Sequence, residues 1–241
     1  MNKFILLIVL CVCTSFISYS QEFTVGVKGG VNYSYIGDVL SFGGSYQQGA
    51  PNITYTPDNE IGTQFGGFIN VEFGKFFIRP ELLFTKFKNS YDFPFNRSYW
   101  NSKRIDIPIM FGYEVFKPIS IYAGPIINST SDMTIDGVQQ PITFDKRDIN
   151  IGAGILVDFG RFGFDVRYEI STTEEPRQRT DFNYNSAGSP GYGVNVADMM
   201  PYKLGVISIS AHINIFSTDK DRIGSFFGGL FRGDKCYCPY D

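Results

Sequence analysis

Three segments decide the fold: FFIRPELLFTKF at residues 76–87, RIDIPIMFGYEVF at residues 104–116 and ISIYAGPII at residues 119–127. Apolar and polar side chains alternate along each of them. In the second segment, Ile105 and Ile107 share one face, while Arg104 and Asp106 share the other. Successive side chains of a β-strand point to opposite faces, so each segment reads as a strand with one apolar and one polar face. Because the alternation in the second segment lasts more than ten residues, against about 5–6 for an ordinary strand, it favours strands that cross a bilayer.

The same alternation predicts further strands at residues 23–35, 61–73, 148–159, 162–170 and 202–216, which makes eight in all. The connections between the eight alternate in length. The long ones fall at residues 36–60, 89–102, 128–147 and 173–200, and very short turns join the other pairs. This asymmetry is typical of outer-membrane barrels, which have short periplasmic turns and longer extracellular loops. The sequence therefore predicts an all-β protein, an eight-stranded antiparallel up-and-down transmembrane barrel with both ends in the periplasm.

Two features predict irregularities within these strands. Proline has no N–H to donate to a ladder, so Pro80, Pro108 and Pro125 predict local ladder breaks or bulges. Near Gly205 the apolar residues Leu204 and Val206 fall out of phase with the rest of their strand. That change of phase predicts a bulge at Gly205.

The two ends of the chain differ from the barrel. Residues 1–20 combine Lys3, an apolar run and small residues before Gln21, which predicts a secretory signal peptide. The predicted barrel then covers residues 21–216, and a periplasmic tail covers residues 217–241. The tail has apolar residues at helical spacing and two thiols: Ile223, Phe226, Phe227, Leu230, Phe231, Cys236 and Cys238. These residues are candidates for docking a partner protein or the leaflet surface; equally, the tail can fold against the rim of its own barrel.

Composition excludes some functions and gives no sign of a cofactor. The formal net charge is −3, so no basic surface for nucleic acid is expected. Cys236 and Cys238 supply only two ligands, and Asp132 and Asp136 in a long loop lack further ligands nearby in sequence. We therefore expect neither a metal nor another cofactor.

The polar faces of the strands define the predicted barrel interior. Eight strands leave a lumen just wide enough for side chains to fill. The charged residues and the single histidine on this face are Lys28, Glu72, Arg79, Glu81, Arg104, Asp106, Glu114, Asp148, Asp158, Asp165, Arg167, Glu169 and His212. Buried charges need partners, so these residues are expected to form a salt-bridged plug. An ion-conducting lumen and a buried binding site are the alternatives.

His212 raises the question of catalysis, because Ser208 and Ser210 share its inferred face. Residues two apart on one strand are about 7 Å apart, which is too far for a nucleophile and its base. A lumen histidine with a structural role is therefore the favoured interpretation. No catalytic residue is assigned.

The blocks RPELLFTKF, RIDIPIMFGYEVF, IYAGPII and INIGAGILVDFGRFGFDVRYEIS occur in this order. In this respect the chain resembles the PorT-like outer-membrane β-barrel family of Bacteroidota-type bacteria, over about residues 23–216. The resemblance implies an eight-stranded outer-membrane barrel and brings no catalytic residues with it. The namesake is associated with type IX secretion, but membership alone does not carry that role to this chain.

These observations lead to one expected function and two alternatives. We expect a non-catalytic barrel with a plugged lumen, serving as a structural or accessory subunit of an outer-membrane assembly for secretion, barrel insertion or uptake. Its expected partners are outer-membrane lipids and other outer-membrane or periplasmic proteins, reached through the long loops and the tail. The alternatives are a small-solute or ion pore and, with less support, a lipid-modifying enzyme that uses His212.

Overall fold

A computed structural model describes residues 22–42, 52–183 and 191–219. Within them the chain forms thirteen strands, and no helix long and apolar enough to cross a membrane occurs there. The strands are β1 (Glu22–Tyr35), β2 (Val39–Ser41), β3 (Ile53–Tyr55), β4 (Asp58–Asn59), β5 (Gly62–Phe73), β6 (Phe76–Asp92), β7 (Arg97–Phe116), β8 (Ile119–Ile135), β9 (Arg147–Asp158), β10 (Phe162–Ser171), β11 (Gln178–Asp181), β12 (Val196–Met199) and β13 (Gly205–Ser217). The predicted signal peptide and the tail beyond Asp219 lie outside the described residues.

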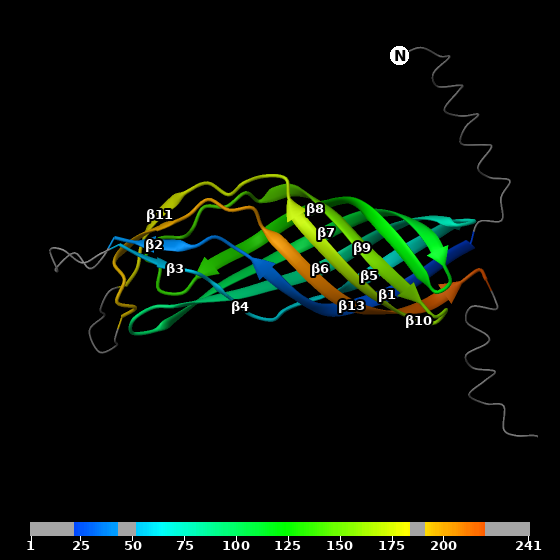
Figure 1. The fold of residues 1–241 in the computed structure, drawn as a ribbon, viewed down its shortest axis with the longest axis horizontal. Coiled ribbons are helices and arrows are strands. Elements are labelled where there is room, and N and C mark those ends of the chain that lie inside the picture. The colour runs from blue at the N-terminus through cyan, green and yellow to red at the C-terminus, as the bar shows by residue number, and fades with distance from the viewer. Residues whose placement is uncertain (1–21, 43–51, 184–190, 220–241) are drawn as a thin grey trace, which may run out of the picture.

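Eight of the strands form a closed antiparallel ring. Their order is β6-β5-β1-β13-β10-β9-β8-β7, and a further pairing between β6 and β7 closes it. Each strand pairs with its neighbours in sequence among the eight, so the topology is up-and-down (Figure 1). The predicted eight-stranded barrel is confirmed.

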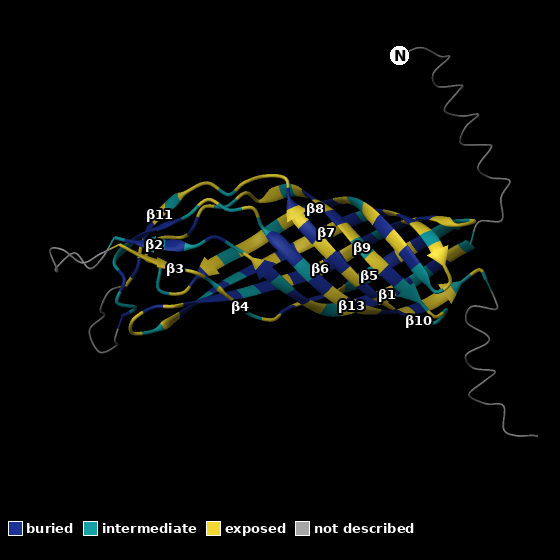
Figure 2. Cartoon of the chain, viewed as in Figure 1, coloured by how far each residue is buried: buried dark blue, intermediate teal, exposed yellow. Residues whose placement is uncertain are grey.

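Alternation of burial follows the period-two pattern of the sequence. Along β7, Arg104, Asp106 and Met110 are buried, whereas Ile105 and Phe111 are exposed. Buried and exposed residues form a checkerboard over the barrel wall in Figure 2. Because the apolar side chains point outward and the polar side chains point inward, the outer surface of the barrel is suited to contact with lipid.

Tight turns gather at one end of the barrel, called here the short-turn end. Gly74 and Gly160, in the turns before β6 and β10, have φ angles of 65° and 90°. These left-handed conformations favour glycine, since a Cβ would clash with the backbone. The start of β1 and the end of β13 lie at this same end, on the right of Figure 1.

Strands extend further than predicted at the opposite, long-loop end. The region 89–102 was predicted to be a loop, but β6 continues to Asp92 and β7 begins at Arg97. Likewise, β8 runs to Ile135 through part of the predicted loop 128–147. These extensions lack the simple apolar–polar alternation because their side chains pack on the loops rather than on lipid: Tyr91 and Trp100 are almost completely buried there.

The long loops build a cap with its own core. β11, β12, β2 and β3 form a second antiparallel sheet of four strands, to the left of the barrel in Figure 1. Val39 of β2 and Met199 of β12 belong to an apolar cluster that also includes Phe87 of β6, Phe182 and Val194. Residues 36–60 and 173–200 were predicted to be long loops, but parts of them form the short strands and the packed core of this cap.

The predicted irregularities are only partly present. Each of the three prolines lies at a break in one ladder: Pro80 between β5 and β6, Pro108 between β6 and β7, and Pro125 between β7 and β8. Each ladder resumes in the same register beyond the break, so the prolines interrupt ladders without making bulges. No bulge occurs at Gly205, which is simply the first residue of β13. Val206 is apolar on the inward face because it belongs to the cap core. The shift between β1 and β13 lies instead between Val25 and Gly26.

Candidate functional site

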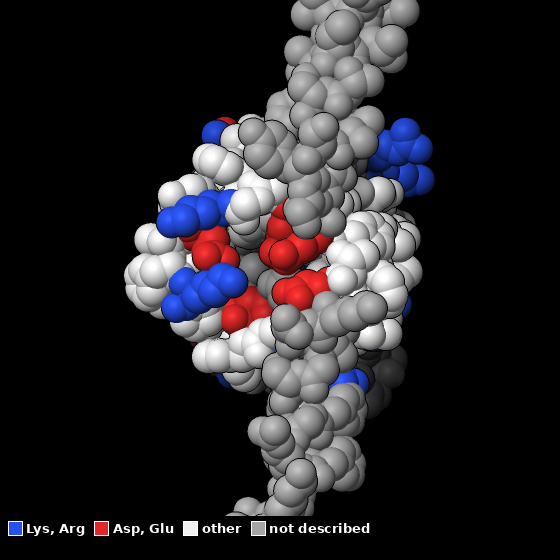
Figure 3. Space-filling model, turned by 90° about the vertical axis from the view of Figure 1, so that its right-hand side faces the viewer, with Lys and Arg blue, Asp and Glu red and all other residues white. Residues whose placement is uncertain are grey.

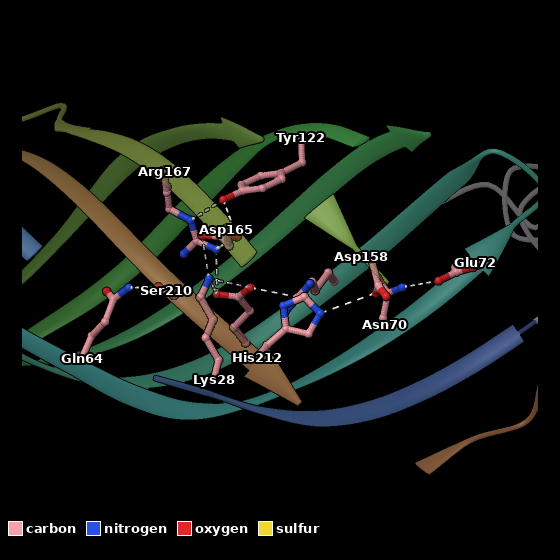
Figure 4. Close-up of polar contacts among 12 residues, drawn as sticks. Lys28, Gln64, Asn70, Glu72, Tyr122, Asp158, Asp165, Arg167, Ser210 and His212 are labelled. Atoms are coloured by element: carbon pink, nitrogen blue, oxygen red, sulfur yellow. Dashed lines mark hydrogen bonds and ion pairs between the residues drawn. The ribbon is translucent and has the colours of Figure 1, made fainter. Parts of the chain in front are cut away.

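A cluster of ion-paired side chains lies near the middle of the barrel interior. The Nζ of Lys28 lies 3.3 Å from Oε2 of Glu81 and 3.1 Å from Oδ1 of Asp165. Arg167 donates to the same Glu81 oxygen at 2.7 Å. The hydroxyl of Tyr122 donates to Asp165 at 2.6 Å and accepts from Nε of Arg167 at 3.2 Å (Figure 4). These residues come from β1, β6, β8 and β10, so the cluster ties together strands from different sides of the ring.

Arg79 completes this first cluster. Its Nε lies 3.1 Å from Oε1 of Glu81, and its guanidinium lies 3.7 Å from the ring centre of Phe68. Glu81 therefore contacts three cations. With Lys28, Arg79 and Arg167 against Glu81 and Asp165, the first cluster has a formal charge of 3 − 2 = +1.

A second cluster lies toward the long-loop end. Arg104 forms ion pairs with Asp106 and, at 2.6 Å, with Glu169. Thr85 donates to Asp106 at 2.6 Å, and Asn150 donates to Glu169. One cation and two anions give this cluster a formal charge of 1 − 2 = −1. The two clusters together are neutral, which is what a low-dielectric interior requires.

This arrangement explains the excess of acids in the sequence-predicted lumen set. The four cations and four of the anions, Glu81, Asp106, Asp165 and Glu169, are buried inside the barrel. The remaining acids are only half-buried and lie toward the ends: Glu72, Glu114 and Asp158 at the short-turn end, and Asp148 at the long-loop end. Ordered charge pairs thus fill the middle of the barrel, and the surplus acids lie at its ends, where they are partly exposed to water.

An apolar cluster packs beside the first charge cluster, which it contacts through Tyr122. It consists of Phe77, Met110, Tyr122, Ile126 and Leu156. Glycines on the same inner face make room for it. A Cβ on Gly154 would lie 2.4 Å from the Tyr122 hydroxyl, and one on Gly152 would lie 2.8 Å from Ile126. The sequence Gly152-Ala153-Gly154 thus serves packing within β9.

His212 does not form a catalytic pair. It is almost completely buried, its Nε2 lies 3.5 Å from Oδ2 of Asp158, and its ring packs edge-on against Phe68. Neither ring nitrogen has a hydrogen-bond partner among the described residues. Ser210 instead accepts a hydrogen bond from Gln64 at 2.6 Å. In the described part of the chain, therefore, no serine is placed to be activated by this histidine.

Other candidate residues are placed without forming a site. Asp132 pairs with Lys103 at 3.6 Å, both well exposed, and Asp136 lies in the turn after β8. Over the described part of the chain, no group of three or more His, Cys, Asp or Glu side chains is placed to hold a metal. The tail candidates Ile223, Phe226, Phe227, Leu230, Phe231, Cys236 and Cys238 lie outside the described residues.

The cap holds charged residues that the sequence pattern does not reveal. Asp198 is buried on β12 and accepts from Arg177 at 2.6 Å and from Arg179 at 2.9 Å. The hydrogen bond from Arg179 is the main cause of a lowered pKa for this carboxyl. Nearby, burial raises the pKa of Glu175, with Asp145 and Asp148 adding to the effect. Segments as short as QRTD and VADM give no sequence signal that they pair. These contacts are therefore visible only in the folded structure.

A closed eight-stranded barrel with an apolar outer wall, a polar interior and long loops at one end is the architecture of an outer-membrane β-barrel protein. The chain belongs to the outer membrane protein β-barrel domain family, whose model matches residues 19–175. This membership places the protein in the outer membrane. No curated protein matched the sequence.

Solved structures of small outer-membrane proteins are similar to the chain at low identity. Ail, the attachment invasion locus protein of Yersinia pestis, in complex with the heparin analogue sucrose octasulfate, is 12% identical with a TM-score of 0.44, covering 81% of this chain and 99% of that one. OprG of Pseudomonas aeruginosa is 11% identical with a TM-score of 0.43, covering 81% and 97%. Neisserial surface protein A is 10% identical with a TM-score of 0.39, covering 79% and 97%. At this degree of similarity, none of them bears on the function of this chain.

Proposed function

We propose that the protein is a non-catalytic outer-membrane barrel that acts as a structural or accessory subunit of an outer-membrane protein assembly. The observation that carries this proposal is the closed, charge-neutral interior. Glu81 alone contacts three cations from β1, β6 and β10. An interior so occupied leaves the two ends and the outer wall as the surfaces available for function.

We place the short turns in the periplasm and the cap outside the cell, as in other barrels of this architecture. Residues 1–20 then serve as the signal peptide that delivers the chain to the envelope. The resemblance to PorT-like barrels makes a secretion, barrel-insertion or uptake assembly the class of complex to look for. The cap and the short-turn end, with the tail that follows Asp219, are the proposed contact surfaces.

The geometry weighs against both alternatives. A pore would need the charge clusters and the apolar cluster that contains Phe77 and Leu156 to rearrange together. A hydrolase would need a nucleophile beside His212, whose nearest described charged partner is Asp158 at 3.5 Å.

Co-purification tests the proposal. A tagged full-length chain is extracted from its native membrane in a mild detergent and compared with a chain stopped after Asp219. This end point keeps the hydrogen bond from the Thr218 N–H to the Phe23 carbonyl, at 2.9 Å, next to the end of the ladder between β1 and β13. We expect the full chain to migrate in a complex much larger than 27.1 kDa plus detergent. Recovery of the lone barrel at every detergent strength would refute the proposal.

A further inference from the structure

The short-turn end of the barrel opens into a cavity of about 340 Å³, called here the acidic mouth. Its charged lining consists of Glu22, Glu72, Glu114, Asp158 and Asp219 with Lys75 and Lys117. The formal charge of this lining is 2 − 5 = −3. In Figure 3, which looks onto this end, acidic residues surround a hollow and basic residues lie to one side of it.

Part of the buried lining of the acidic mouth is apolar. Phe77 and Leu156 are buried, line the cavity and belong to the apolar cluster that packs beside the first charge cluster. The carboxylates therefore share the cavity with apolar side chains, and a lower local dielectric strengthens their attraction for a cation. A guest with a cationic head on an apolar stem matches both parts, as the side chains of Lys and Arg do.

Asn70 gives an independent sign that the mouth accepts a polar guest. This residue lines the cavity and is 5% exposed. Its Nδ2 donates to Glu72 at 2.7 Å, but its Oδ1 has no hydrogen-bond partner among the described residues (Figure 4). A buried acceptor without a donor costs free energy of folding. A guest that brings N–H groups would satisfy it.

We propose that the acidic mouth is the docking site for a Lys- or Arg-bearing segment of a periplasmic partner protein. This inference rests on the proposed function, because it supplies the contact by which the barrel joins an assembly. Charge complementarity selects the partner: five carboxylates on the lining attract a cationic segment and repel an acidic one. Hydrogen bonds from guanidinium or ammonium groups to these carboxylates would hold it in place.

The test uses a fluorescein-labelled penta-arginine peptide and the full mature chain refolded in detergent micelles. Binding is followed by fluorescence anisotropy at low salt. The mouth variant is Glu72→Gln with Glu114→Gln. The control variant, Asp145→Asn with Asp181→Asn, removes the same charge from exposed positions on the long-loop side. Resistance to SDS at room temperature reports that each variant is folded.

We expect the mouth variant to bind at least about tenfold more weakly, since one charge-assisted hydrogen bond contributes about that factor. The control should change less than about twofold, and added salt should weaken binding by the wild-type chain. Absence of binding, or equal losses in the two variants, would overturn the inference. A chain stopped after Asp219 that binds the peptide more than tenfold tighter would show instead that the protein's own tail occupies the mouth.

The two proposals fail in different ways. If the peptide binds as expected but native extraction yields only a lone barrel, the site stands and the subunit role is refuted. If the native complex persists unchanged in the mouth variant and the peptide does not bind, the subunit role stands and the docking site is refuted.

Discussion

Glu81 offers the sharpest test of the charged interior. The substitution Glu81→Gln keeps the shape of the side chain but removes the charge that Lys28, Arg79 and Arg167 share, at 3.3, 3.1 and 2.7 Å. The first cluster then changes from a formal charge of +1 to +2, with Asp165 as its only remaining anion. Glu81 and Lys28 have fully buried side chains, so water cannot screen the excess.

Removing one partner of a buried ion pair costs about 3–5 kcal/mol, and we expect this loss in the free energy of unfolding of Glu81→Gln. The assay is urea unfolding of the barrel in lipid vesicles. Trp100 is the single tryptophan of the chain and is 1% exposed, so its fluorescence reports unfolding without a label. Loss of SDS resistance at lower temperature gives a second reading.

Two further variants make the test specific. Asp132→Asn removes a carboxylate that is half exposed and 3.6 Å from Lys103, and it should change stability by no more than about 1 kcal/mol. Glu81→Gln combined with Arg167→Gln returns the first cluster to +1, so the double variant should be at least about 1 kcal/mol more stable than additivity predicts. A loss below about 1 kcal/mol for Glu81→Gln, or strict additivity, would refute the reasoning.

Three other predictions follow from the structure. Gly154→Val should destabilise the barrel by about 1–3 kcal/mol or more, because its Cβ would lie 2.4 Å from the Tyr122 hydroxyl. The control is Gly67→Ala, whose Cβ meets nothing closer than 3.5 Å and which should be nearly neutral in the same urea titration. In planar bilayers the wild-type chain should give no conductance above background, and reproducible unitary steps would contradict a closed lumen. The hydrogen bond from Arg179 is the main cause of the lowered pKa of Asp198 in the folded state. The stability that this carboxylate contributes is therefore present above about pH 4 and is lost as pH falls through the folded-state pKa. The difference in free energy of unfolding between wild type and Asp198→Asn should disappear below that pKa.

Period-two alternation was enough to locate the barrel strands. It placed the inner and outer faces of segments such as residues 104–116, because lipid outside and a narrow polar lumen inside impose opposite demands on successive residues. The alternation of short and long connections gave the up-and-down order. Both signals are local, and both were confirmed by the ring of pairings.

The alternation of apolar and polar residues did not predict the strands whose side chains face the cap instead of lipid. Tyr91 and Trp100 lie on strands that extend past the barrel wall, yet the sequence around them reads as loop, because those side chains pack against a cap instead of facing lipid. Val206 was read as out of phase for the same reason. The cap strands are only three or four residues long, too short to show a period.

The sequence by itself determined that charged residues fill the lumen, since parity alone puts them on the inner face. Only the tertiary structure decided which of them pair. Glu81 and Arg167 lie 86 positions apart and meet across the ring, and Tyr122 joins them although its phenol ring reads as apolar. The division into a neutral interior and an acidic mouth has the same origin. Strand register fixes how far along the barrel each charge lies, and a charge deep inside must be balanced by an opposite charge, whereas one at the mouth is also stabilised by water.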